Sequence, residues 1–281
     1  MTHLDLSQIT LCAVDSANVP LTARALHLSM QHCKFGDAVL FSHAGAHGLF
    51  RTVTIDDIKS IADYQTFRLR KLPALLDTPL ALIVEWDGYV VEPRAWRPSF
   101  QEFDYIGAKW PYYSDGMSVG NSGFSLQSKK LFKALADPRF VPVPGENVDT
   151  LICRTYRPTL EREFGIRFAP APVADLFSYE NHLPGRPTFG FHGCGNMWRY
   201  TTDAEMIEIV EQLNPYVFAT DHFALLIVNY AFMRKFVPLE QIYARMREYI
   251  APDRARALLR RVTAPATADT IFTLCEVLIN R

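Results

Sequence analysis

Hydrophobic and polar positions divide the chain into a first part that mixes apolar runs with helical periodicity and a last part that is almost purely helical. In the first part, continuous apolar runs predict strands over 9–14, 38–42 and 80–85. Apolar residues at helical spacing predict helices over 21–33, 54–62 and 64–72. Thr54 is the expected N-cap of the second helix, and Pro73 ends the third. Strands that are continuously apolar and separated by helices favour a parallel α/β sheet covered on both faces.

The segment 104–192 has a different composition, rich in glycine, proline and aromatic residues. Its apolar pattern predicts short strands over 105–108, 123–126 and 167–170. One helical stretch runs from Glu146 to Phe164 and is expected to break at Pro158. This composition is typical of a substrate-shaping region built on loops.

From Thr202 onward, helical periodicity continues with few interruptions. The expected helices cover 203–213, 217–236, 239–249, 252–261 and 267–279. We therefore predict an α/β nucleotide-binding domain over 1–200 and a helical C-terminal region over 201–281.

Composition and charge exclude some classes of protein and leave others open. The chain has 281 residues, is 49% apolar and carries a formal net charge of −1, so bulk electrostatics give no reason to expect nucleic acid as a partner. Five scattered cysteines without a C-x-x-C pair indicate mostly buried thiols in a reducing compartment. The segment 1–7 lacks a signal-peptide pattern, and the apolar stretch 216–237 contains charged residues. We expect a cytoplasmic protein without a membrane span.

Two carboxylates, Glu85 and Asp87, follow the apolar run 80–84 and precede Gly88. Alternation along a strand places residues i and i+2 on the same side, and ligands bind at the carboxyl ends of strands in open α/β sheets. Carboxylates there are suited to Mg²⁺ or Mn²⁺, which prefer oxygen ligands and share them with phosphates. The alternative is a strand end closed by solvated acids, and short motifs alone do not decide between the two.

Two glycine-containing turns add candidate residues. Asn121, Ser122 and Gly123 precede a predicted strand, where they either contact sugar hydroxyls or form an ordinary hairpin turn. His192 lies between Gly190 and Gly193, where an imidazole can complete a manganese site, although a lone histidine is more often structural.

A general base is needed to take the proton of an attacking hydroxyl. Asp149 is our first candidate for that base and Glu146 the second, against the alternative that both acids only favour a helix N-terminus. Trp110, Tyr112 and Tyr113 lie in a loop and are candidates for an aromatic acceptor platform.

Several blocks together resemble a bacterial and eukaryotic family long catalogued as a domain of unknown function and grouped with GT-A-fold glycosyltransferases. The blocks are Glu85-Trp86-Asp87-Gly88, Asp104-Tyr105-Ile106-Gly107-Ala108, Gly120-Asn121-Ser122-Gly123-Phe124-Ser125-Leu126 and Phe189-Gly190-Phe191-His192-Gly193. The resemblance covers 9–198 and leaves the helical tail outside.

The resemblance implies a glycosyltransferase that uses a nucleotide diphosphate sugar, with UDP as the expected nucleotide, and a D-x-D-type metal motif at 85–87. Glu85 departs from a strict D-x-D, which makes Asp87 the main ligand, with His192 as a further one. The segment 145–149 is similar to the Gly-Glu-Asp-Asp-Asp stretch of inverting β-galactosyltransferases. Because Asn147 occupies one acidic position there, the choice between Asp149 and Glu146 stays open.

The same interpretation assigns the nucleotide to the end of the first strand, where Asp15 and Asn18 would contact uracil or ribose. A turn that leads into a helix explains these two residues equally well. Arg68 and Lys71 are candidates for contacts with base or phosphate, with a solvated helix face as the alternative. The acceptor is expected to be a glycan, a lipid-linked molecule or another hydroxyl compound.

Three other functions compete with this one. A nucleotide-sugar pyrophosphorylase or hydrolase usually has a glycine-rich phosphate loop after its first strand, and 14–22 contains no glycine. A catalytically inactive nucleotide-sugar-binding or scaffold protein would bind nucleotide without turnover, and Glu85 gives that alternative some weight. A peripheral membrane protein at the inner face of the membrane is suggested by tail arginines: Arg245, Arg247, Arg254, Arg256, Arg260 and Arg261.

Overall fold

The computed structural model describes residues 3–281, so the first two residues of the N-terminal segment lie outside it. The chain forms two compact units, one that ends at His192 and one formed by residues 193–281. The predicted domain boundary near residue 200 stays a prediction; residues 193–200 belong here to the second unit.

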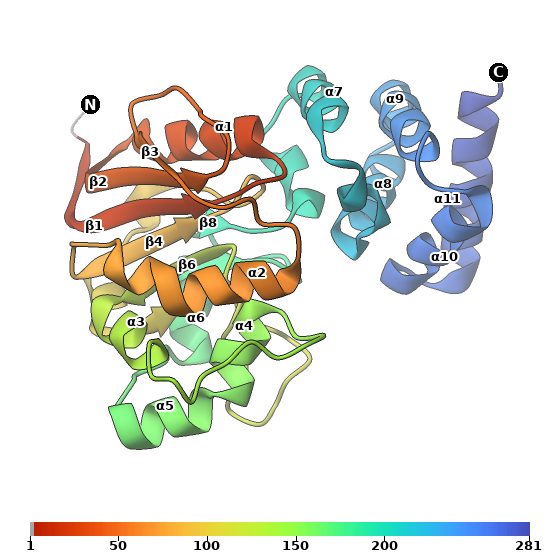
Figure 1. Cartoon of the computed structure of the whole chain (residues 1–281). Coiled ribbons are helices and arrows are strands. Elements are labelled where there is room, and N and C mark those ends of the chain that lie inside the picture. The colour runs from red at the N-terminus through yellow and green to blue at the C-terminus, as the bar shows by residue number, and fades with distance from the viewer. Residues whose placement is uncertain (1–2) are drawn as a thin grey trace. The chain divides into compact units, whose positions relative to one another are not determined.

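The first unit is built on a six-stranded mixed sheet of order β3-β2-β1-β4-β6-β5 (Figure 1). Its strands are β1 (Leu4–Val14), β2 (Cys33–Ser42), β3 (Arg51–Thr54), β4 (Leu80–Val84), β5 (Tyr105–Ile106) and β6 (Phe124–Ser128). The first four strands are parallel; the apolar runs predicted this for β1, β2 and β4 but gave no sign of β3. β6 runs antiparallel to β4, and Phe124 pairs with Val84. The turn that precedes β6 therefore reaches the carboxyl end of β4.

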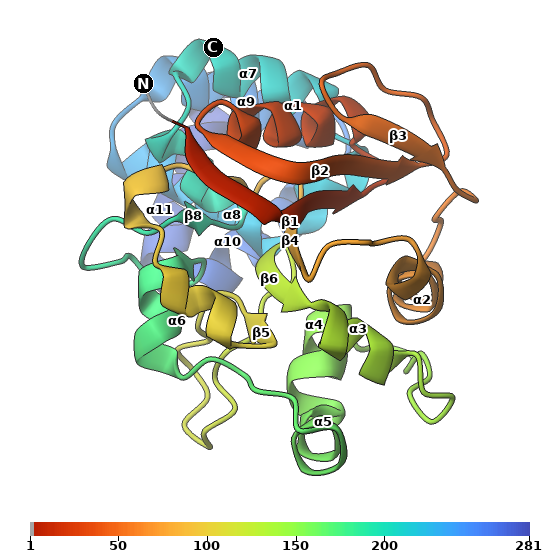
Figure 2. The same cartoon turned by 90° about the vertical axis from the view of Figure 1, so that its left-hand side faces the viewer.

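Helices cover both faces of this sheet (Figure 2). On one face, α1 (Val19–Met30) and α6 (Ala171–Phe177) share a core with β1, β2 and β4. On the other face lie α2 (Ile61–Thr66) and α3 (Lys129–Leu135), and α2 continues as a π-helical turn over Phe67–Lys71. A third core joins α3 to the segment that contains α4 (Val148–Thr150) and α5 (Arg157–Phe164).

The predicted helix over 54–62 is wrong. Arg51–Thr54 forms the edge strand β3, and Thr54 pairs with Ser42 of β2. The helix begins only at Ile61, where the Ser60 hydroxyl accepts the Asp63 N–H at 3.1 Å. Backbone pairing along the open edge of β2 outweighs the local helix-start signal, because only the folded sheet supplies that edge.

Two predictions in the segment 104–192 also change in detail. The expected strand over 167–170 is reduced to a single bridge between Phe168 and Tyr105. The helical stretch from Glu146 breaks at Tyr156, and Pro158 lies in the first turn of α5, where its missing N–H costs no hydrogen bond.

The second unit consists of helices. They are α7 (Asp203–Gln212), α8 (Asp221–Phe232), α9 (Phe236–Arg247), α10 (Pro252–Val262) and α11 (Pro265–Ile279). The single helix predicted over 217–236 is wrong, because the Thr220 hydroxyl caps a new helix and Arg234 adopts a left-handed φ of 57°. Within residues 3–281, no helix is long and apolar enough to cross a membrane. All five cysteines are free and buried.

Candidate metal centre and active site

Glu85 and Asp87 are brought together by a tight turn at the end of β4. The strand ends at Val84, and the Gly88 N–H donates to the Glu85 carbonyl oxygen at 3.0 Å. The two carboxylates therefore converge through the turn rather than through strand alternation, which was the basis of the prediction. Gly88 is needed here because a Cβ would lie 2.9 Å from the Gly123 carbonyl oxygen.

His192 reaches the same place from a short parallel pair of strands, β7 (Ser178–Tyr179) and β8 (Gly190–Phe191). Tyr179 pairs with Phe191, so the residues that follow them, Glu180 and His192, are neighbours. The His192 Nδ1–H donates to Glu180 Oε1 at 2.8 Å, because a carboxylate can only accept. The Nε2 atom then faces Asp87 Oδ1 at 3.4 Å and Glu85 Oε2 at 3.5 Å.

These side chains form a candidate site for a divalent cation. Ligand atoms of Glu85, Asp87 and His192 all lie within 4.8 Å of one another. Two carboxylates and one imidazole nitrogen suit Mn²⁺, and the oxygens also suit Mg²⁺. A histidine whose second nitrogen donates to a buried carboxylate is the usual arrangement at metal sites, because it fixes the tautomer and the ring orientation. The residues present therefore fit a metal ion.

The turn before β6 supports the imidazole. Asn121 has a left-handed φ of 61°, and its side-chain oxygen accepts the N–H groups of Gly123 and Phe124 at 3.1 and 3.2 Å. Its amide nitrogen lies 2.9 Å from His192 Nδ1. A Cβ on Gly123 would lie 2.1 Å from His192 Nε2, so the imidazole itself requires a glycine there. Contacts of Asn121, Ser122 and Gly123 with a sugar stay a prediction.

Asp149 lies close to the cluster, on α4. Burial, followed by the negative charges of Glu180 and Glu85, raises the pKa of Asp149 to about 6, against an opposing hydrogen bond from the Thr150 N–H. A carboxylate with a pKa near neutrality is suited to act as a general base. The carboxylate of Glu146, by contrast, accepts the Thr155 hydroxyl at 2.7 Å, and among the described residues no hydrogen bond joins it to the cluster.

Asp15 and Asn18 form the turn between β1 and α1. Asp15 Oδ1 accepts the N–H groups of Ala17 and Asn18 at 2.6 and 2.9 Å, and Oδ2 accepts the Thr22 hydroxyl. The helix-leading turn considered above is therefore present. Burial and, more weakly, the charge of Glu85 raise the pKa of Asp15, which places it near the same edge of the sheet. A role for either residue in nucleotide binding stays a prediction.

Arg68 and Lys71 have different environments. The explanation of Arg68 as part of a solvated helix face is wrong, because the residue is only 1% exposed. Its guanidinium donates to the Tyr64 hydroxyl at 2.9 Å, which in turn donates to Glu85 Oε1 at 3.2 Å. The Tyr64 hydroxyl therefore links the positively charged Arg68 to Glu85 of the acidic cluster. Lys71 is exposed and pairs with Asp56 at 2.8 Å, as expected for a solvated face.

The sequence analysis missed two residues at this site, Glu180 and Tyr64. Glu180 is buried yet charged, and it follows a two-residue strand whose partner lies twelve residues later. In the sequence, Glu180 is a single acid that follows an aromatic residue. This pattern does not distinguish a buried acid from an acid in an exposed loop. Tyr64 falls on a predicted helix, and nothing in the pattern shows that its hydroxyl reaches Glu85.

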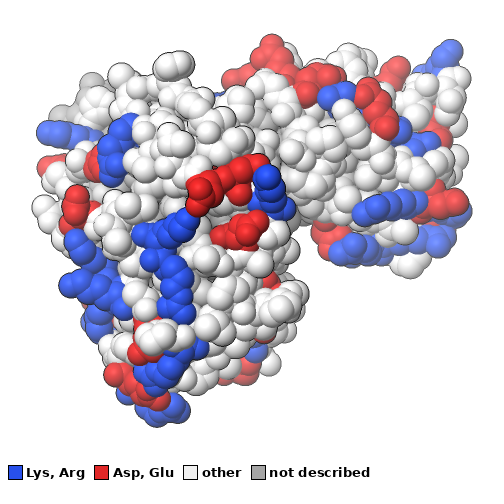
Figure 3. All heavy atoms as spheres, viewed as in Figure 1, with Lys and Arg blue, Asp and Glu red and all other residues white. Residues whose placement is uncertain are grey.

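The face of the molecule seen in Figure 3 carries both signs of charge. Acidic side chains gather there in a patch that overlies the segment between β3 and α2 of Figure 1, with Lys and Arg side chains beside them. In that segment Asp56 pairs with Lys71 at 2.8 Å, and Asp57 lies 3.8 Å from Lys59.

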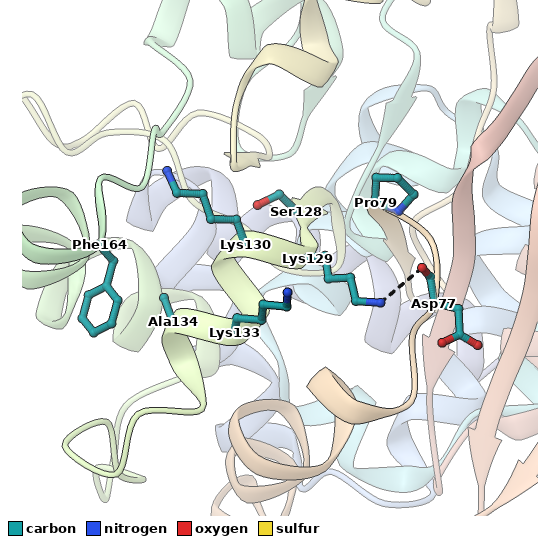
Figure 4. Close-up of a pocket in the computed structure, with 8 residues that line it drawn as sticks. All are labelled: Asp77, Pro79, Ser128, Lys129, Lys130, Lys133, Ala134 and Phe164. Atoms are coloured by element: carbon teal, nitrogen blue, oxygen red, sulfur yellow. Dashed lines mark hydrogen bonds between the residues drawn. The ribbon is translucent and has the colours of Figure 1, made fainter.

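A hollow of about 680 Å³ lies at the amino end of β4, the end opposite to the candidate metal centre (Figure 4). Pro79, just before β4, and Ser128, at the end of β6, line it together with Lys129, Lys130 and Lys133. Lys129 donates to the Asp77 carbonyl oxygen at 3.2 Å, and Lys130 donates to the Gly165 carbonyl oxygen. Because Pro79 and Ser128 lie at the amino end of β4, whereas Glu85 follows its carboxyl end, the hollow is not part of the candidate metal centre.

Glu180→Gln is expected to weaken binding of Mn²⁺ by about 10- to 100-fold, because the neutral amide no longer fixes or polarises the His192 ring. Calorimetric titration with MnCl₂ measures this change. Glu102→Gln, which alters an exposed glutamate, is the matched control and should leave the affinity unchanged. Equal affinity of the wild type and the Glu180 variant would show that Glu180 does not act through His192.

Asp149→Asn is expected to stabilise the metal-free protein at pH 8. The folded-state pKa of about 6 exceeds the ordinary value of 3.8, so the wild type loses stability as pH rises from about 4 to about 6. Two pH units correspond to at most about 3 kcal/mol, and asparagine keeps the acceptor for the Thr150 N–H. Urea unfolding in EDTA should show the gain at pH 8 and its disappearance at pH 4. A gain of the same size at both values would contradict the raised pKa.

A mixed α/β sheet whose strand ends carry two carboxylates and a histidine defines an α/β protein with a candidate metal centre. Residues 50–192 match the family described as "Protein of unknown function (DUF5672)". This match covers just over half of the chain, and the chain belongs to this family. The matched region ends at His192, the histidine of the candidate metal centre.

Comparison with solved structures gives a further likeness. The chain is similar to a solved structure described as "crystal structure of a glycosyltransferase involved in the glycosylation of the major capsid of PBCV-1", with a sequence identity of 13% and a TM-score of 0.35. The likeness covers 68% of this chain and 96% of that chain. No curated protein matches the sequence significantly.

Proposed function

We propose that this protein is a metal-dependent glycosyltransferase that moves a sugar from a nucleotide diphosphate, with UDP as the expected nucleotide, to a hydroxyl acceptor. One observation carries the proposal. A candidate metal centre of Glu85, Asp87 and His192 lies at the carboxyl end of a central strand, and Asp149, a carboxylate with a raised pKa, lies near it. The resemblance of the sequence blocks to GT-A-fold glycosyltransferases supports the same conclusion.

The metal ion, Mn²⁺ or Mg²⁺, would be held by Asp87 and His192, with Glu85 as a further ligand. When bound, it supplies Lewis-acid stabilisation of the charge that develops on the leaving diphosphate. Glu180 accepts the His192 Nδ1–H and thereby fixes the orientation of the ring. Asp15 and Asn18, at the end of β1, are the proposed contacts for the nucleoside, and Ser122 and Gly123 for the donor sugar.

Asp149 is the proposed general base. It takes the proton from the acceptor hydroxyl as that oxygen forms a bond to the anomeric carbon. The bond from the anomeric carbon to the diphosphate oxygen breaks at the same centre, and the nucleoside diphosphate leaves with the electron pair. The raised pKa of Asp149 gives the carboxylate enough basicity for this transfer while it remains largely ionised near pH 7.

A thermal-shift screen tests the proposal. Nucleoside diphosphates and nucleotide sugars are added with Mn²⁺, with Mg²⁺ or with EDTA, since a ligand that binds only the folded protein raises its melting temperature. We expect UDP or a UDP-sugar to raise it in the presence of Mn²⁺ or Mg²⁺ and not in EDTA. If no nucleotide raises the melting temperature with either metal, the proposed function is wrong.

An assay of UDP release from a UDP-sugar distinguishes an enzyme from an inactive binding protein. A catalytically inactive relative would bind the donor as tightly but would not release UDP with any acceptor. The raised pKa of Asp149, which suits a general base, favours an active enzyme over that alternative.

The tail arginines do not favour a peripheral membrane role. Most are paired within the second unit: Arg256 and Arg260 with Asp269, Arg261 with Asp221, Arg245 with Glu248, and Arg247 with Glu276. Paired cations attract an anionic surface weakly, because the neighbouring acid cancels much of their charge.

A further inference from the structure

We propose that Tyr112 is the stacking platform for a pyranose ring of the acceptor, so that the acceptor is a glycan. This inference rests on the proposed function, and it names the substrate class of the same site. Three observations carry it: the way in which the loop of Tyr112 is held, the segments against which it packs, and the exposure of the ring.

The loop between β5 and β6 is closed at its base. Lys109 and Val119 form an antiparallel bridge, and the Trp110 N–H donates to the Ser118 carbonyl oxygen at 2.7 Å. The Trp110 ring covers Gly120, where a Cβ would lie 2.0 Å from the indole. Since Gly120 precedes Asn121, this base is continuous with the turn that supports His192.

The tip of the loop is held by Arg154. Its guanidinium binds Asp115 with contacts of 2.7 and 3.3 Å and donates to the Met117 carbonyl oxygen at 2.9 Å. It also stacks on Tyr113, 3.5 Å from the ring centroid. Arg154 lies in the π-helical turn that directly follows α4, so the loop is fastened to the segment that carries Asp149.

Tyr112 is the member of this aromatic group that remains exposed. Trp110 packs in a core with Val148 and Leu151, on either side of Asp149, and Tyr113 packs against that core. Tyr112 contacts Tyr113 edge to face at 4.8 Å between centroids, yet it is 63% exposed. A core-packing explanation accounts for Trp110 and Tyr113 but not for an apolar ring held in solvent by a fastened loop.

Tyr112 belongs to a loop that is fastened to the segment of the candidate base, Asp149. In keeping with this placement, partial burial, then the charge of Glu180 and, more weakly, that of Asp149 raise the pKa of Tyr112 to about 12. A rigid tyrosine offers a flat apolar surface at a low cost in conformational entropy, and the C–H face of a pyranose is apolar in the same way.

Saturation-transfer NMR tests the inference with four probes in the presence of UDP and Mg²⁺. The probes are methyl β-galactopyranoside, methyl β-glucopyranoside, methyl α-mannopyranoside and methyl β-N-acetylglucosaminide. We expect transfer to the ring C–H protons of at least one probe. Its dissociation constant should rise about tenfold or more in Tyr112→Ala and stay within about twofold in Tyr112→Phe, because the ring rather than the hydroxyl provides the contact. Tyr216→Ala is the matched control, since that tyrosine of the second unit is 56% exposed.

The outcomes separate this inference from the proposed function. Binding of UDP is measured by calorimetry with the same samples and should be equal in all variants. If no pyranoside binds, or if binding survives in Tyr112→Ala, the inference is wrong even when UDP binds normally. If Tyr112→Ala weakens a UDP-sugar but not the pyranosides, the ring contacts the donor and the inference is also wrong. Tyr112-dependent pyranoside binding without any binding of UDP would show a glycan site at Tyr112 but overturn the proposed function, and with it the assignment of the pyranose as an acceptor.

Discussion

Asp87→Ala is expected to abolish the Mn²⁺-dependent stabilisation by UDP and to lower the release of UDP from a UDP-sugar by about 10³-fold or more. Asp87 is buried at the end of β4, and its Oδ1 atom lies 3.4 Å from His192 Nε2. Without this carboxylate, one glutamate and one histidine remain, too few protein ligands to hold a metal ion that also binds a diphosphate. Thermal shift and calorimetry measure binding, and a coupled UDP assay measures turnover.

Asp77→Ala is the matched control, because Asp77 lies just before β4, at the other end of the same strand. It should keep both the stabilisation and the turnover. Asp87→Asn preserves the shape of the side chain and covers the case in which the alanine variant folds poorly. If UDP with Mn²⁺ stabilises both Asp87 variants as much as the wild type, Asp87 is not a metal ligand, and the proposed function loses its basis.

Asp149→Ala is expected to lower turnover by about 10²- to 10⁴-fold while binding of UDP with Mn²⁺ stays within about twofold of the wild type. The base acts on the acceptor hydroxyl and not on the nucleotide, so its loss affects the chemical step alone. In the wild type, kcat should fall as pH drops below about 6, where Asp149 takes up a proton. A bound cation favours the ionised carboxylate and so opposes the rise in the pKa of Asp149. The fall in kcat is therefore expected at or below pH 6 in the metal-loaded protein. Steady-state assays over pH 4.5–8 measure it.

Glu146→Gln discriminates between the two candidate bases. The Glu146 carboxylate accepts the Thr155 hydroxyl, an interaction that glutamine can keep, so turnover should change little. If Glu146→Gln is inactive and Asp149→Ala is active, the base is Glu146. If both variants are as active as the wild type, neither acid is the base.

Much of the first unit could be predicted from the sequence. Strands β1, β2 and β4 contain long apolar runs, and such runs report burial on both faces whatever lies beside them. β3 escaped prediction because its four residues include only one apolar side chain, and it forms by pairing with the edge of β2. The break at Arg234 escaped for a similar reason, since a left-handed residue other than glycine has no reliable sequence signal.

The composition of the candidate site followed from residue types, but its arrangement did not. Glu85, Asp87 and His192 were predicted as metal ligands because carboxylates after a strand and a histidine between glycines suit a divalent cation, and because their sequence blocks resemble a glycosyltransferase family; the structure brings their ligand atoms within 4.8 Å. Their role as ligands stays a prediction. Gly123 was predicted to let a sugar approach, whereas the structure gives it a neighbour within the protein, the His192 imidazole.

The sequence by itself determined the long apolar strands, most of the helices and which side chains have the chemistry of a metal centre, because periodicity and residue type are local properties. Only the tertiary structure decided which of these side chains meet. Glu180 lies beside His192 through the register of β7 and β8, and Arg68 reaches Glu85 through Tyr64 from a buried helix. Register and burial depend on the pairing and packing of distant segments, and the folded chain alone fixes them.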